Sequence, residues 1–184
     1  MSLPESPRLF RLLLALALAG LTAGCFQPLY GDQVTVGGAG IRDKMSAVEV
    51  APVTTAAGVR LPRVAGEVRN ELIFHLTGGG EANTASYRLF VNIGATNLQV
   101  IADPNTARTD VQNYGIDAGY RLVEVGTGKQ VISGSSFARV SYDTPGQQQR
   151  FAGSRGLRDA ENRAAKVIAE NIRSRLASYF TAGT

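Results

Sequence analysis

The sequence is poor in the residues that build covalently linked or metal-stabilised folds. Its 184 residues include one cysteine, one histidine and no tryptophan. A single cysteine cannot form an intramolecular disulfide bond, so the fold has to be stabilised by buried apolar surface or by a partner. One cysteine and one histidine are also too few for a zinc cluster. We therefore expect no metal site and no cofactor.

The sequence also has little net charge. The formal net charge is +4, and the sequence contains no run of Lys or Arg. This is too little basic charge for a protein that binds nucleic acid mainly by releasing counterions, so nucleic acid is not an expected partner. With 44% hydrophobic and 18% charged residues, the composition fits one globular domain and excludes a disordered or collagen-like chain.

Residues 1–24 have the layout of an export signal. Arg8 and Arg11 precede an apolar run over residues 12–21. Ten apolar residues make a helix of about 15 Å, which is too short to cross a hydrocarbon core of about 30 Å. The sequence therefore predicts a cleaved signal peptide over residues 1–24.

The apolar run ends in a segment that resembles the lipobox of bacterial lipoproteins, Leu21-Thr22-Ala23-Gly24-Cys25. In such proteins the cysteine is acylated and becomes the first residue; the alternative is an unmodified cysteine after an ordinary signal peptide. Each buried methylene contributes about 0.8 kcal/mol, so three acyl chains on Cys25 would anchor the protein permanently. Phe26, rather than aspartate, follows the cysteine, which resembles the rule for transfer to the outer membrane. We expect a lipid anchor at Cys25 and a location on the periplasmic side of the outer membrane.

The segment that follows the cysteine is predicted to be a tether. Residues 25–44 contain Pro28 and several glycines and show no sustained hydrophobic period. The folded domain is predicted to begin near Met45 and to extend over residues 45–184.

Hydrophobic periodicity predicts six elements, which are strands at 45–51, 86–102, 114–122 and 131–142 and helices at 62–77 and 157–180. Pro52 ends the first strand, and glycines at 78–80 end the first helix. In the second strand the apolar alternation slips, and a bulge at Gly94–Asn97 would explain the change of phase. The Gly-x-Gly at 126–128 lies between two strand patterns with no helix after it, so it is predicted to form a hairpin turn rather than a phosphate loop.

The order of these elements, without a repeat or a second linker, predicts an α+β two-layer sandwich. Each strand has one apolar face and each helix one apolar stripe. A mixed four-stranded sheet with two helices on one face (β-α-β-β-β-α) buries all of them. The other face is expected to be polar, with sheet edges available for pairing with another chain. The residues expected on this polar face are Arg88, Asn92, Asp117, Arg121 and Arg139.

No set of residues has the spacing of an active site. His75 lies four residues after Glu71 on the first helix, where an i,i+4 contact is favoured over a catalytic dyad. No serine lies in a Gly-x-Ser-x-Gly motif. Asp159 and Glu161 are interpreted as favourable charge at the start of the last helix rather than as a glycosidase pair. The protein is therefore predicted not to be an enzyme; an envelope hydrolase would require a fold that joins His75 to a serine and an acid.

Two blocks of sequence carry a family resemblance. Cys25 is followed by Phe26-Gln27-Pro28-Leu29-Tyr30-Gly31, and the first predicted helix contains Val68-Arg69-Asn70-Glu71-Leu72. With the order of the elements, they make the chain resemble the LptE family of lipopolysaccharide-assembly lipoproteins. The resemblance implies a non-enzymatic protein that plugs the lumen of the LptD outer-membrane barrel in a 1:1 complex, helps the barrel assemble and assists lipopolysaccharide transport to the cell surface. The alternative is an accessory lipoprotein of another envelope transporter or barrel-assembly complex.

The resemblance also implies contacts with lipopolysaccharide, whose phosphates and acidic sugars are anionic. Arginine suits such groups because its planar guanidinium can bind two oxygens at once. The positions that match the family's basic loop residues are Arg108, between the second and third strands, and Arg150, before the last helix. The alternative interpretation is that both residues are ordinary loop arginines whose side chains are solvated and bind no ligand.

Overall fold

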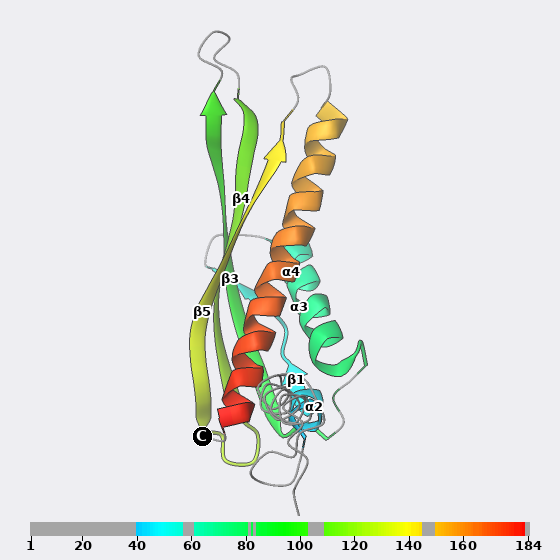
Figure 1. Cartoon of the computed structure of the whole chain (residues 1–184), viewed down its shortest axis with the longest axis vertical. Helices are drawn as coiled ribbons and strands as arrows, with labels where there is room; N and C mark the ends of the chain where they lie inside the picture. Colours follow the sequence, from blue (N-terminus) through cyan, green and yellow to red (C-terminus); the bar gives the residue numbers. More distant parts are fainter. Residues whose placement is uncertain are drawn as a thin grey trace, which may run out of the picture.

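The computed structural model describes residues 40–56, 61–80, 82, 84–102, 109–144 and 150–182. The segment predicted as a signal peptide, the predicted lipid attachment at Cys25, and Arg108 lie outside the described residues. The described residues form a five-stranded mixed sheet with two long helices, α3 (Pro62–Thr77) and α4 (Arg150–Ala182), on one of its faces (Figure 1). The predicted two-layer α+β architecture is confirmed.

A long antiparallel hairpin forms the centre of the sheet. β3 (Tyr87–Ala102) pairs with β4 (Thr109–Glu124), which pairs in turn with β5 (Gln130–Asp143). The 16 residues of β3 or β4 extend over about 53 Å, and the 33 residues of α4 extend over about 50 Å. These lengths match, and α4 therefore runs along the length of the hairpin (Figure 1).

The edge beside β3 consists of one strand path interrupted by a proline. β1 (Val48–Val50) and β2 (Thr54–Thr55) both pair with β3 in parallel. The Ala51 N–H still donates to the Leu89 carbonyl at 3.0 Å. Pro52 has no N–H to donate, so the ladder breaks there and resumes at Thr54. This is why the structure has five strands where the sequence predicted four.

The first element of the described residues is a short helix, α2 (Ile41–Ser46), which the sequence did not predict. Ile41 and Met45, one helical turn apart, are both buried, and the Asp43 carboxylate accepts a hydrogen bond from the Gly40 N–H at 3.3 Å. Residues 41–44, predicted as tether, thus belong to the fold, and the strand predicted from Met45 begins only at Val48. Six residues are too few for a helical period to stand out among the preceding glycines.

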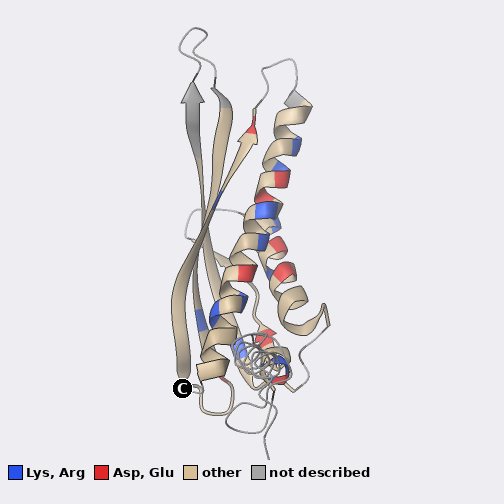
Figure 2. Cartoon of the chain, viewed as in Figure 1, with Lys and Arg blue, Asp and Glu red and all other residues tan. Residues whose placement is uncertain are grey.

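Both long helices follow from local sequence signals. Pro62 occupies the first turn of α3, and Gly78 ends the helix in a left-handed conformation with φ 77°. α4 extends to both sides of the predicted range and begins at Arg150 instead of Leu157. Charged residues of both signs lie along the outward sides of α3 and α4 (Figure 2).

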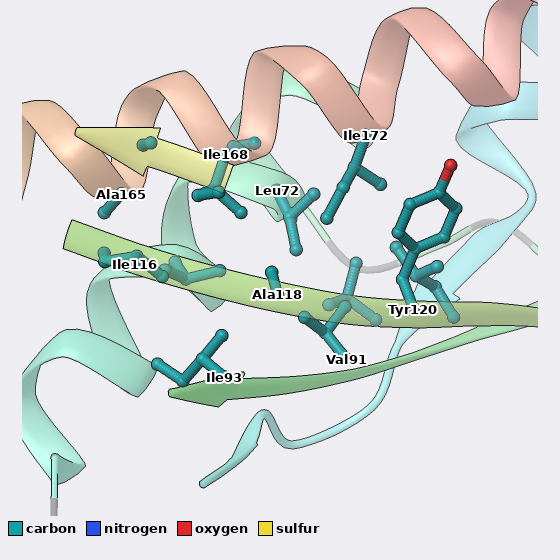
Figure 3. Packing of buried hydrophobic residues seen from close by; sticks show 14 of the residues in the cluster. Leu72, Val91, Ile93, Ile116, Ala118, Tyr120, Ala165, Ile168 and Ile172 are labelled. Atoms are coloured by element: carbon teal, nitrogen blue, oxygen red, sulfur yellow. The ribbon is translucent and has the colours of Figure 1, made fainter. Parts of the chain in front are cut away.

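The core fills the space between the helices and one face of the sheet, which we call the inner face. α3 contributes Leu72, the sheet contributes Ile93 and Ile116, and α4 contributes Ile168 and Ile172, all fully buried (Figure 3). α4 also presents a row of buried alanines to the interior, Ala160, Ala164, Ala165, Ala169 and Ala177. Such small side chains allow the helix backbone to approach the sheet closely.

The predicted bulge at Gly94–Asn97 is wrong. The register between β3 and β4 runs without a shift from Tyr87 to Gln99, and the irregularity lies between Gln99 and Ala102. Asn97 lies on the same face of β3 as the buried Leu89, Val91 and Ile93. Its side-chain amide donates a hydrogen bond to the Tyr142 hydroxyl at 3.0 Å. A polar residue that is hydrogen-bonded on the inner face breaks the apolar alternation without a backbone slip.

The interpretation of Asp159 and Glu161 as helix-dipole partners is also wrong. α4 begins at Arg150, so both acids lie beyond its first turn, where the dipole effect has faded. Asp159 instead pairs with Arg163 at 2.7 Å, and Glu161 pairs with Arg63 of α3. These acids hold side chains together within α4 and between the two helices.

Candidate functional site

The sheet has a face that no helix covers among the described residues, and we call it the open face. The prediction that this face is polar is confirmed, since Arg88, Asn92, Asp117, Arg121 and Arg139 are all exposed. Strand alternation also puts Glu49, Phe90, Gly119, Ser133, Ser135 and Phe137 on the open face. The face is thus hydroxyl-rich and charged, with isolated aromatic rings.

Two arginines of the open face are neutralised by carboxylates on neighbouring strands. Arg88 donates to Glu49 through two nitrogens at 2.8 and 3.0 Å. Arg139 donates to both oxygens of Asp117 at 2.9 and 3.2 Å. All four side chains are substantially exposed, so each pair contributes about 1 kcal/mol or less to stability. Their main effect is to fix the side chains and to cancel charge on this surface.

Arg121 is held differently. Its guanidinium carbon lies 4.8 Å from the centre of the Phe90 ring, directly across from it in the register of β3 and β4. Phe90 is therefore the stacking platform for a cation, which explains why one apolar residue interrupts the polar side of β3. The sequence predicted Arg121 on this face, but its contact with Phe90 depends on strand register, which no local signal specified.

The two segments predicted to contact lipopolysaccharide leave the fold at the same end. The chain between Ala102 and Thr109 joins the end of β3 to the start of β4, and the chain after β5 leads into α4. In Figure 1 the start of α4 and the end of β5 lie at one end of the molecule, and α2 lies at the other. Arg108 and the side chain of Arg150 lie outside the described residues, so their predicted roles stay predictions.

His75 makes the contact predicted for it. Its Nε2 atom lies 3.6 Å from a carboxylate oxygen of Glu71, one turn earlier on α3. Ser46 lines the same hollow of about 330 Å³, but its hydroxyl donates to the Asp43 carbonyl at 2.9 Å. Among the described residues no hydrogen bond joins Ser46 to His75. A nucleophile and base pair, which a serine hydrolase requires, is therefore not formed at this place.

The inner face carries tyrosines whose ionisation is suppressed. Burial raises the pKa of Tyr114 and of Tyr120 above the usual value of 10.0. The charges of Arg63 and Arg175, respectively, oppose this rise but do not outweigh it. These phenols are therefore neutral at physiological pH.

Two features are absent from the described part of the chain, a cluster of metal ligands and a helix that could span a membrane. No group of three or more metal-ligating side chains gathers within the described ranges. Likewise, no described helix combines the length and apolar character that a membrane span requires. α4 has the length, but charged residues recur along it.

Solved structures share this fold. A lipoprotein from Caulobacter crescentus superposes with a TM-score of 0.60 at 22% identity, covering 78% of this chain and 97% of that one. A protein from Xanthomonas campestris reaches 0.51 at 10% identity over 74% and 87% of the two chains. Lipoprotein B from Nitrosomonas europaea reaches 0.50 at 13% identity over 75% and 90%. At these identities the likeness establishes the fold, a small two-layer α+β domain that bacterial lipoproteins use.

The family follows from the sequence match. The family model for LptE, described as lipopolysaccharide-assembly, matches residues 45–176, which is most of the chain. No curated protein sequence matches. The chain belongs to the LptE family, and its role is in lipopolysaccharide assembly.

Proposed function

We propose that this protein is a non-enzymatic outer-membrane lipoprotein that occupies the lumen of an LptD-type barrel in a 1:1 complex. In this role it helps the barrel to assemble and assists the transport of lipopolysaccharide to the cell surface. The observation that carries the proposal is the LptE family match over residues 45–176, which spans both long helices almost completely and the whole sheet.

The open face supports a position inside a barrel. The interior of an outer-membrane barrel is polar and water-filled, so a protein that fills it needs hydrogen-bonding surface and few unpaired charges. The open face offers both, because Arg88 and Arg139 are neutralised by Glu49 and Asp117. Apart from Phe90 and Phe137, the large apolar side chains at the centre of the sheet are turned to the other side, where α3 and α4 cover them.

The elongated shape supports a division of tasks between the two ends. The described chain begins at Gly40 and α2, near the end opposite the β3–β4 connection (Figure 1). An acylated Cys25 would hold the first of these ends near the periplasmic surface of the outer membrane. Arg108 and Arg150 would then contact lipopolysaccharide from segments attached at the other end.

Purification from detergent-solubilised outer membranes tests the barrel partnership. We expect the tagged full-length lipoprotein to recover one large barrel protein in equimolar amount. Repeated recovery without a barrel protein would contradict the proposal. Recovery of a different transporter or a barrel-assembly complex would instead establish the accessory-lipoprotein alternative.

Membrane anchoring is tested separately with Cys25→Ala. We expect this variant to leave the membrane fraction in a high-salt wash, whereas the parent stays bound. If the variant remains bound, anchoring does not depend on acylation of Cys25.

The lipopolysaccharide contacts are tested with Arg108→Glu and Arg150→Glu. Each variant is expected to bind purified lipopolysaccharide more weakly than the parent, because a carboxylate repels the phosphates. Lys166→Glu, at an exposed position on α4, is the charge-matched control. Equal weakening in the control would mean that net charge, and not these positions, controls the binding.

A further inference from the structure

On the open face, Arg121 differs from Arg88 and Arg139. No carboxylate of the described residues forms an ion pair with it, and its guanidinium lies against the Phe90 ring. The contact with the ring is to the guanidinium carbon at 4.8 Å, and no hydrogen bond to another described residue uses the N–H groups of Arg121. These donors therefore remain available to an anion that approaches from solvent.

A hollow of about 480 Å³ lies beside Arg121. Its lining is mixed, and the larger part of it is apolar, including Pro52 and Val91 beside Phe90. The polar side chains in the lining are Thr54, Asn92, Arg121, Gln130 and Ser133. Gly119 leaves open space in the hollow, because a Cβ built there has no atom within 4 Å. A second hollow of about 380 Å³ shares Asn92 and Gly119 and reaches to Phe137 on β5.

The polar groups of the lining retain hydrogen-bonding capacity. Asn92 uses one amide N–H to reach the Thr54 hydroxyl at 2.9 Å, which leaves its second N–H and its carbonyl oxygen. The side chains of Ser133 and Gln130 form no hydrogen bond with another described residue. A ligand with several hydroxyl groups matches this arrangement, since it can donate to and accept from the same lining.

We propose that this hollow binds a saccharide that carries a phosphate or carboxylate group. Arg121 forms a two-pronged contact with the anionic group, and Asn92, Ser133 and Gln130 bind sugar hydroxyls. The volume is in the range of small-molecule sites. The proposal deepens the proposed function, on which it rests for the source of the ligand: the anionic sugars of lipopolysaccharide would contact the open face as well as Arg108 and Arg150.

Isothermal titration calorimetry with the full-length lipoprotein in detergent tests this site. The probe is the deacylated, phosphorylated saccharide of lipopolysaccharide, compared with its dephosphorylated form and with inorganic phosphate. We expect the phosphorylated saccharide to bind most tightly. Arg121→Gln should weaken binding by about tenfold, as expected for loss of hydrogen bonds to a charged group. Arg88→Gln, which removes an ion-paired arginine from the same face, should change binding by less than twofold.

A second variant fills the hollow instead of removing charge. Gly119→Val adds a side chain into open space on a strand, so we expect the thermal midpoint to stay at or above that of the parent while saccharide binding weakens. Unchanged binding in Arg121→Gln, equal loss in Arg88→Gln, or equal affinity for the dephosphorylated saccharide would each overturn the proposal. Equal affinity for inorganic phosphate would overturn the saccharide assignment.

The test is independent of the barrel partnership. If the parent recovers the barrel but binds no saccharide, the hollow is not a saccharide site and the proposed function stands. If saccharide binding depends on Arg121 but no barrel is recovered, the proposed function fails and the site remains.

Discussion

Replacing Gly134 by alanine tests how tightly the sheet is packed beneath α4. Gly134 of β5 lies opposite Tyr120 of β4, and a Cβ at position 134 would lie 2.7 Å from the Tyr120 hydroxyl oxygen and 2.9 Å from its Cζ. Tyr120 is 6% exposed, and its ring turns towards α4 (Figure 3), so its surroundings leave little room for it to move. Overpacking costs about 1–3 kcal/mol, and the stiffer unfolded chain offsets about 0.4–1 kcal/mol. We expect the free energy of unfolding to fall by about 1–2 kcal/mol.

Gly119→Ala is the matched control on the neighbouring strand. A Cβ at position 119 meets no atom within 4 Å, so only the unfolded-state effect remains and the variant should gain about 0.4–1 kcal/mol. Urea titration measures both changes. With a slope of about 2 kcal/mol/M, the midpoint should fall by about 0.5–1 M for Gly134→Ala and rise by about 0.2–0.5 M for Gly119→Ala, at unchanged slope. A Gly134→Ala midpoint equal to or above that of the parent would refute the reasoning.

A double variant locates the cause of the strain. The nearest atom to the added Cβ is the Tyr120 hydroxyl oxygen, so Tyr120→Phe should relieve part of the clash. We expect the effect of Tyr120→Phe on the free energy of unfolding to be more favourable in Gly134→Ala than in the parent, by about 0.5 kcal/mol or more. Strictly additive effects would mean that the destabilisation arises elsewhere.

Two further predictions concern buried tyrosines. Tyr142→Phe should lower the free energy of unfolding by about 1–2 kcal/mol in urea titrations, because the Tyr142 hydroxyl is hydrogen-bonded to Asn97 at 3.0 Å and to Gln112 at 2.5 Å. Tyr114→Phe should not lower the free energy of unfolding, because the Tyr114 hydroxyl is buried without a hydrogen-bond partner among the described residues. Burial raises the pKa of Tyr114 and Tyr120 above 10.0, so the unfolded chain loses these protons first as the pH rises. Tyrosine ionisation should therefore leave the thermal midpoint unchanged well below pH 10 and lower it above pH 10. The decrease above pH 10 should be smaller in Tyr114→Phe, which lacks one of these phenols.

Most of the fold follows from signals that act within one element. The alternation of Tyr114, Ile116 and Leu122 predicted a strand with one buried face, and each of these side chains is buried in the structure. The terminal glycine of α3 likewise predicted where that helix ends. α2 was missed because its burial depends on tertiary contacts of Ile41 and Met45, and six residues provide no period of their own.

The open face was predicted as a surface but not as a site, and the reason is strand register. Alternation alone put Arg121 on the polar side, but its partner Phe90 is 31 positions away in the sequence. They meet because β3 and β4 pair Phe90 with Arg121 directly. A slip of one residue in β4 would turn Arg121 towards α3 and α4 and expose Leu122, so burial of the inner face selects the phase of the strand. Burial selects only the phase, and a slip of two residues keeps Arg121 on the open face while moving it away from Phe90. The stack at 4.8 Å and the hollow beside it therefore depend on the complete pairing of the hairpin, which forms only when the chain folds.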